Sequence, residues 1–124
     1  MWKKYFLIAI FIVLIDQFLK YFFPYKVKNY GASFNLLENY KLILISISIL
    51  AIILFLFLFF KTKENKLGLS FLISGTFSNL IDRIFLGYVI DYIPFFNLFT
   101  FNLADLSNTI GVLILIIITL KNEK

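Results

Sequence analysis

Histidine and cysteine are both absent from this sequence of 124 residues. Without cysteine the chain has no disulfide, no thiol catalysis and no thiolate metal site. Without histidine it has no serine–imidazole or cysteine–imidazole pair, and a zinc enzyme is disfavoured. We therefore expect no metal and no cofactor, and a carboxylate is the natural general base.

Charged residues are also scarce, at 15% of the chain, whereas apolar residues make up 61% and the mean hydropathy is +0.93. This composition lies far from that of soluble globular domains. Four long apolar runs each approach the roughly 20 residues that cross a bilayer. We predict an all-α integral membrane protein that forms a single domain over residues 1–124. Its four transmembrane helices are expected at about 5–23, 41–60, 67–85 and 103–120.

The net charge of +5 comes mainly from lysines that flank the apolar runs, so it indicates membrane topology and not a nucleic-acid partner. Seven basic residues fall on one side of the membrane (Lys3, Lys4, Lys61, Lys63, Lys66, Lys121 and Lys124) and five on the other (Lys20, Lys26, Lys28, Lys41 and Arg83). Lys20 and Arg83 each have an aspartate nearby, so the unpaired ratio is seven to three. The positive-inside rule then predicts a multi-pass protein with both termini in the cytoplasm.

The first apolar run contains an ionisable pair near its end. Asp16 and Lys20 are spaced i, i+4, so they share one helix face and can pair. Ionisable groups at membrane depth are expected to face the protein interior or water. A pair that only reaches the headgroups from a helix end is the simpler alternative.

The second half of the third run combines small and polar residues. Asn79, Asp82 and Arg83 follow one face by i, i+3 and i, i+4 spacing, and Gly75 continues that face one turn earlier. The small residues Gly75 and Ser78 allow a neighbouring helix to approach closely. Asp82 and Arg83 are expected to close a buried charge network, unless they are interfacial charges at a helix end.

Asp91 and Asp105 lie in the polar, aromatic segment around the loop between the last two apolar runs. Two carboxylates that share a proton can act as an aspartic-protease dyad, in which one takes a proton from water and the other donates to the scissile carbonyl oxygen. Asn102 is placed to cap the fourth helix, and Asp105 lies in its first turn. The alternative is that the two aspartates only cap and solvate.

Five motifs, in order along nearly the whole chain, resemble those of the bacterial lipoprotein signal peptidases (signal peptidase II). The family patterns are D-x-x-x-K, N-x-G-x-x-F, G-G-x-x-G-N-x-x-D-R, G-x-V-x-D-[FY] and F-N-x-A-D. The matching segments are Asp16-Gln-Phe-Leu-Lys20, Asn29-Tyr-Gly-Ala-Ser-Phe34, Ser74-Gly-Thr-Phe-Ser-Asn-Leu-Ile-Asp-Arg83, Gly87-Tyr-Val-Ile-Asp91-Tyr and Phe101-Asn-Leu-Ala-Asp105. Each motif alone is weak, but the ordered set is specific.

The resemblance implies a membrane aspartic endopeptidase. Its substrates are diacylglyceryl-modified prolipoproteins, whose signal peptide is cut off just before the lipidated cysteine of the lipobox. Asp91 and Asp105 become the catalytic pair. The other motif residues take two roles: Asn29, Asn79, Arg83 and Asn102 bind substrate or support the pair, and Asp16, Lys20 and Asp82 are structural polar partners.

By the same resemblance the protein is a monomer in the bacterial cytoplasmic (inner) membrane, in contact with membrane lipids, with its active site near the outer surface. The first outer loop, residues 24–40, is implied to form a small extracytoplasmic β-cradle, and the second to cover the active site. Tyr30, Ser33 and Phe34 are the residues suggested for a short interfacial strand. Ser74 and Ser78 depart from the family pattern because they replace glycines, and the segment from 91 to 105 is shorter than expected.

Three other functions remain open. A channel or transport subunit is expected to spread ionisable groups through the membrane depth, whereas here they cluster near one surface. A serine–lysine protease needs a neutral Lys20 beside Ser33, Ser74 or Ser78, but Asp16 one turn away favours the charged lysine. A membrane scaffold uses the polar residues only to join helices.

Overall fold

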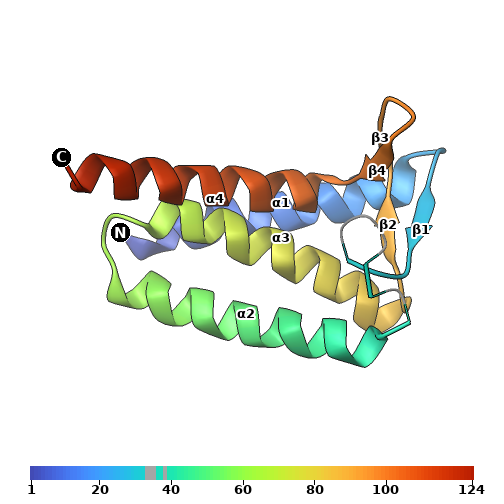
Figure 1. The fold of residues 1–124 in the computed structure, drawn as a ribbon, viewed down its shortest axis with the longest axis horizontal. Coiled ribbons are helices and arrows are strands. Elements are labelled where there is room, and N and C mark those ends of the chain that lie inside the picture. The colour runs from blue at the N-terminus through green and yellow to red at the C-terminus, as the bar shows by residue number, and fades with distance from the viewer. Residues whose placement is uncertain (33–35, 38) are drawn as a thin grey trace.

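Four helices make up most of the computed structural model, which describes residues 1–32, 36–37 and 39–124. They are α1 (Trp2–Phe22), α2 (Lys41–Lys61), α3 (Lys66–Phe85) and α4 (Leu103–Asn122). Both termini lie at the end of the bundle opposite the strands (Figure 1). The helix α1 starts at Trp2 and not near residue 5, because a helix satisfies its own backbone and does not have to begin where the apolar run begins.

The outer helices present apolar side chains outward, as expected for contact with lipid. By length and composition α1, α2 and α4 can each cross a membrane. In contrast, α3 has many buried polar and small residues, because it is the helix that packs against all three others. Figure 1 shows α3 between α2 on one side and α1 and α4 on the other. The protein is therefore an integral membrane protein built around a polar central helix.

The contact between α3 and α4 is close enough to require a residue without a side chain. A Cβ atom added to Gly75 would lie 2.4 Å from the backbone oxygen of Ala104. This confirms the expectation that Gly75 lets a neighbouring helix approach. The apolar core lies nearer the termini, where Phe59, Leu69 and Leu72 form a buried cluster. The polar residues are left to the opposite end.

Four three-residue strands cover that opposite end. β1 (Val27–Asn29) from the first loop pairs antiparallel with β2 (Val89–Asp91) from the second, and β3 (Ile93–Phe95) pairs with β4 (Phe99–Phe101) as a hairpin. The first loop thus contributes one strand to a sheet shared by both loops, and not a sheet of its own among the described residues. Tyr30 follows β1 and belongs to no strand, which corrects one suggested strand residue. The other two, Ser33 and Phe34, lie outside the described residues.

Candidate active site

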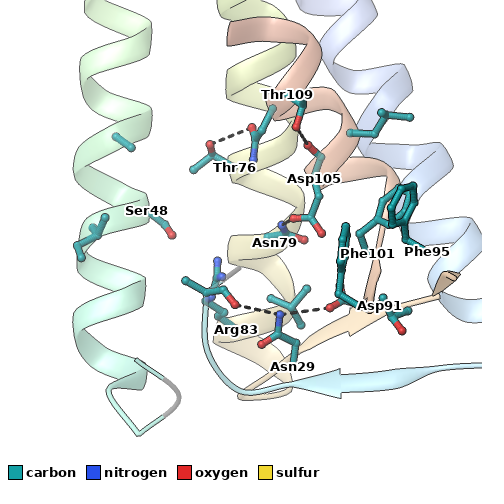
Figure 2. A pocket seen from close by; sticks show the side chains of 18 residues that line it. Asn29, Ser48, Thr76, Asn79, Arg83, Asp91, Phe95, Phe101, Asp105 and Thr109 are labelled. Atoms are coloured by element: carbon teal, nitrogen blue, oxygen red, sulfur yellow. Dashed lines mark hydrogen bonds between the residues drawn. The ribbon is translucent and has the colours of Figure 1, made fainter. Parts of the chain in front are cut away.

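A cavity of about 700 Å³ lies between α2, α3 and α4, beneath the strands. Figure 2 shows Asp91, Asp105, Asn79 and Arg83 gathered at it, with Ser48 of α2 on the opposite side. Its lining is Asn29, Ala32, Ile47, Ser48, Ala51, Thr76, Asn79, Arg83, Val89, Asp91, Phe95, Phe99, Thr100, Phe101, Asp105, Leu106, Asn108 and Thr109. The cavity therefore combines a mainly apolar wall with two carboxylates and a guanidinium, as ligand sites commonly do.

Asp91 is the last residue of β2, and strand pairing sets its position. Its Cα is opposite that of Val27 in β1, so the two-stranded sheet fixes the backbone that carries the carboxylate. The side chain is 3% exposed. Asn29 Nδ2 donates to Asp91 Oδ2 at 3.2 Å (Figure 2), and Asn102 Nδ2 donates to Oδ1 at 3.0 Å. Each carboxylate oxygen thus has its own amide donor.

Asp105 is held by the first turn of α4. Asn102 caps this helix, accepting from the Asp105 backbone N–H at 2.8 Å, and Asp105 Oδ2 accepts from the Asn102 backbone N–H at 3.2 Å. This reciprocal capping box confirms the predicted cap. The other carboxylate oxygen, Oδ1, accepts from Asn79 Nδ2 at 3.1 Å. Asp105 therefore does take part in capping, but it also faces the cavity.

The orientation of the side-chain amides of Asn79 and Asn102 follows from partners that can only donate a hydrogen bond. The Lys20 ammonium donates to Asn79 at 3.1 Å, so the atom facing it is Oδ1 and the Nδ2 group is left for Asp105. The Asp105 backbone N–H likewise requires Oδ1 of Asn102, which leaves Nδ2 for Asp91. Asn102 Nδ2 also contacts Asn79 Oδ1 at 3.0 Å. Asn79 and Asn102 are thus linked, and each presents a donor to one carboxylate.

Lys20 lies in a buried cluster behind Asn79, away from the cavity. Its Nζ is 2.7 Å from Asp16 Oδ2 and 2.9 Å from Asp82 Oδ2, and all three side chains are nearly inaccessible to solvent. The predicted pair of Asp16 and Lys20 is therefore present, and it is internal and not interfacial. With Asn79 as the third acceptor, each Lys20 N–H has a partner.

We expected Asp82 and Arg83 to close one buried charge network together, but the structure separates them. Asp82 faces α1 and pairs with Lys20, whereas Arg83 borders the cavity and contacts the Gly31 backbone oxygen at 3.4 Å. Neighbouring helix residues point about 100° apart, which explains the separation. Within the described residues, Arg83 has no ion-pair partner and its buried Nε has no acceptor. Its remaining donors on the cavity side are available to a ligand.

Two polar residues of this region were not singled out from the sequence. Tyr92 is 1% exposed and donates its hydroxyl to Asp16 Oδ1 at 2.7 Å, while accepting from the Leu103 backbone N–H at 3.0 Å. Gln17 donates to Asp82 Oδ1 at 3.1 Å. The position of Tyr92 next to Asp91 could have indicated that Tyr92 belongs to the polar site. An aromatic residue in an interfacial loop is, however, ordinarily interpreted as a membrane anchor.

The two serines that replace family glycines form helix-to-helix hydrogen bonds. Ser74 Oγ lies 3.0 Å from Ser107 Oγ on α4, and Ser78 Oγ donates to Asp16 Oδ2 on α1 at 2.6 Å. Neither serine makes a hydrogen bond to Lys20, as a serine–lysine catalytic pair requires. Ser33, the third candidate nucleophile, lies outside the described residues.

The environment of Asp91 favours its protonated form. Burial raises the pKa of Asp91 to about 7, and the negative charge of Asp105 contributes in the same direction, against the hydrogen bond from Asn29. Burial also raises the pKa of Tyr92, with the hydrogen bond to Asp16 acting likewise, so the phenol stays a donor. Among the residues that the structure describes, no three acidic side chains are grouped as metal ligands. The charge of Asp105 thus acts on Asp91 across the cavity that both residues line.

Comparisons with known proteins agree on one family. A family model described as Signal peptidase (SPase) II matches residues 8–121. The lipoprotein signal peptidase of Streptococcus pneumoniae is 34% identical over 103 residues, covering 78% of this chain and 67% of the relative. That of Caldanaerobacter subterraneus subsp. tengcongensis is 35% identical over 130 residues, covering 87% and 90%. A solved bacterial membrane enzyme, 29% identical, superposes with a TM-score of 0.91 over 98% of this chain and 90% of its own.

Proposed function

The chain belongs to the signal peptidase II family, and on that premise we propose that it is an aspartic endopeptidase of prolipoproteins. It removes the signal peptide from diacylglyceryl-modified prolipoproteins and cuts just before the lipidated cysteine. One observation carries the proposal: Asp91 and Asp105 both border the same cavity, and the linked amides of Asn102 and Asn79 each donate to one of them.

The mechanism requires one proton for two carboxyl groups. The ionised group takes a proton from a water molecule, whose oxygen attacks the scissile carbonyl carbon, and the protonated group donates to the carbonyl oxygen. Collapse of the tetrahedral intermediate then breaks the C–N bond, and the amine leaves with a proton from the pair. A pKa of about 7 for Asp91 supports the retention of one proton near neutral pH. The two groups titrate as a unit, so the proton belongs to the pair.

The neighbouring residues have supporting roles. Asn29 and Asn102 orient Asp91, and Asn79 orients Asp105. Arg83 contacts the substrate, because it borders the cavity and its one hydrogen bond among the described residues, to Gly31, leaves most of its donors unused. Asp16, Lys20 and Asp82 form the ionic cluster that holds Asn79 in place. No cofactor and no metal enters this scheme.

The apolar helices support a membrane arrangement as part of this proposal. The helices α1, α2 and α4 are long and apolar enough to cross a membrane, and α3 packs against all three of them, so we infer that all four span the bacterial inner membrane. A single chain of one domain carries the site. Both termini face the cytoplasm, and the strands lie at the outer surface beside the lipids. The buried ionisable residues gather at this one end, which disfavours a channel, since a conducting path requires polar groups through the membrane depth.

Cleavage of a synthetic diacylglyceryl-modified prolipoprotein peptide by the purified protein tests the proposal. We expect cleavage just before the lipidated cysteine, and a loss of at least about 100-fold in Asp91→Asn and Asp105→Asn, because each removes a general acid–base group. Glu64→Gln, which changes an exposed carboxylate between α2 and α3, is the control and should retain full activity. Near wild-type cleavage by folded Asp91→Asn and Asp105→Asn would favour a scaffold role for the polar residues.

A further inference from the structure

Thr76 differs from the other described serine and threonine hydroxyls of the four helices. Most of them donate to a backbone carbonyl three or four residues earlier, at 2.7–3.1 Å: Ser46, Ser48, Ser70, Ser74, Thr109 and Thr119. Ser78 and Ser107 instead bond across to another helix at 2.6 and 2.8 Å. Among the residues that the structure describes, Thr76 Oγ1 makes only one polar contact, to Asn108 Oδ1 at 3.5 Å, which is at the outer limit for a hydrogen bond.

Asn108 also has side-chain hydrogen-bonding groups without a partner among the described residues. Its only polar contact within the described residues is the one with Thr76, so its Nδ2 group donates to none of them. Its side chain lies over Gly75, where an added Cβ atom would come within 2.4 Å of Oδ1. If the amide is turned over, Oδ1 becomes the free atom. Either way, a donor or an acceptor faces the cavity that both residues line.

The two residues lie at the same depth, one helical turn below the proposed catalytic pair. Asn108 follows Asp105 by three residues on α4, and Thr76 precedes Asn79 by three residues on the antiparallel α3. Three residues of helix rise about 4.5 Å. An extended peptide covers that distance in one to two residues, at about 3.3 Å each.

A polar group without a partner is unfavourable at membrane depth. An extended peptide entering the membrane carries the same problem, because its backbone N–H and C=O groups have no partner in lipid. We propose that Thr76 and Asn108 form a backbone-binding subsite for the signal peptide, at the peptide groups one to two residues before the scissile bond. The Asn108 amide and the Thr76 hydroxyl can each donate and accept, which suits a peptide group. This inference rests on the proposed function.

A subsite that recognises the peptide backbone can accept signal peptides with different side chains at these positions. A contact to the peptide group orders the chain on the cavity wall whatever residue precedes the cysteine. It also holds the scissile bond near Asp105, which is on the same helix as Asn108. These two are positioning residues, so their loss should raise KM more than it lowers kcat.

The test uses near-isosteric variants and altered peptides. Purified wild type, Thr76→Val, Asn108→Leu and the double variant are compared on a diacylglyceryl-modified lipopeptide, with Thr119→Val as a control outside the cavity. We expect KM to rise about 3- to 10-fold in each single variant, the range for one uncharged hydrogen bond. Thr76→Ser should recover the wild-type value. Thr119→Val should change nothing, because its hydroxyl already bonds to the Leu115 carbonyl.

Substrate changes identify the bonded group. Two further lipopeptides carry an ester in place of the amide at the link one or two residues before the scissile bond. For the wild type, one of these ester lipopeptides should have a KM about 3- to 10-fold higher than the all-amide lipopeptide. For the double variant, the same ester lipopeptide should have the same KM as the all-amide one, because the ester and the two substitutions remove the same hydrogen bond. A third lipopeptide replaces the ester links of the lipid with ethers. If only that substrate shows the shared effect, the subsite binds the lipid and our inference is wrong.

The outcomes separate this inference from the proposed function. If wild type cleaves the lipopeptide and the variants have unchanged KM, the subsite only borders a wet cavity and the inference fails alone. If folded wild type cleaves no diacylglyceryl-modified peptide, the proposed function fails first, and the subsite for that substrate fails with it.

Discussion

Asn102 Nδ2 lies 3.0 Å from Asn79 Oδ1, and this contact joins the supports of the two carboxylates at the cavity. Asn102 also donates to Asp91 and caps the helix that carries Asp105, while Asn79 donates to Asp105 directly. A shift in either amide therefore reaches both carboxyl groups. Substitutions of Asn79 and Asn102 should therefore have strongly coupled effects on activity and more nearly additive effects on the free energy of unfolding.

Asn102→Ser separates capping from orientation. Serine caps a helix about as well as asparagine, but it is too short to reach Asp91 and Asn79. We expect α4 to remain formed and kcat to fall at least about 10-fold, since the carboxylate loses a positioned donor. Asn102→Ala should show the same fall in kcat and unfold with about 1 kcal/mol less free energy than Asn102→Ser. Wild-type kcat in Asn102→Ser would mean that only the cap matters.

The pH dependence of cleavage should reflect the raised pKa of Asp91. The pair needs one proton, so kcat/KM should fall as pH rises through about 7. The hydrogen bond from Asn29 stabilises the ionised carboxylate and lowers this pKa. Asn29→Ala should therefore move the alkaline limb to higher pH, besides weakening activity. A profile measured for Asn97→Ala, at the exposed hairpin turn, serves as the control, and an alkaline limb unchanged by Asn29→Ala contradicts the assignment.

The raised pKa of Asp91 also determines how the free energy of unfolding changes with pH. Asp91 in the unfolded chain titrates near 3.9, so between about pH 4 and 7 the folded state binds more protons than the unfolded state. The contribution of Asp91 to the free energy of unfolding is complete below about pH 4 and is lost as pH rises through about 7. Asp91→Asn, which cannot ionise, should unfold with a weaker pH dependence over this window.

The sequence predicted what depends on local spacing. The apolar runs predicted the helices, i, i+4 spacing predicted the contact of Asp16 with Lys20, and position predicted the cap at Asn102. Gly75 was expected to allow close helix packing, and it does. These features need only a few neighbouring residues to be recognised.

Contacts between distant segments could not be predicted in this way. Nothing local in the first loop indicates that Val27–Asn29 pairs with Val89–Asp91, because short strands have no strong periodic pattern. The Tyr92 hydroxyl reaches Asp16 across 76 positions of sequence. Which of Asp82 and Arg83 faces α1 depends on the rotation of α3 against α1, which spacing along one helix does not define.

Lys20→Met tests the buried ionic cluster. The change leaves Asp16 and Asp82 close together without a cation, and removal of one partner from a buried charge pair is destabilising by about 3–5 kcal/mol. We expect a large loss of unfolding free energy, measured by denaturation in detergent micelles. Lys61→Met at the exposed end of α2 is the matched control and should be nearly neutral. Stability equal to the control would contradict a stabilising role for the ammonium of Lys20 between the two aspartates.

Reporter fusions test the membrane orientation, on which access to prolipoproteins depends. The end of the bundle with both termini also carries the connection from α2 to α3 (Figure 1), which runs from Lys61 to Lys66 and includes Lys63. The positive-inside rule therefore assigns this end to the cytoplasm. A reporter that works only in the cytoplasm should be active when fused after Lys124 or inserted after Lys63. It should be inactive when inserted after Asn97, in the turn between β3 and β4. The opposite pattern would put Asp91 and Asp105 on the cytoplasmic side, where an exported prolipoprotein does not present its cleavage site, and the proposed function would then have to be abandoned.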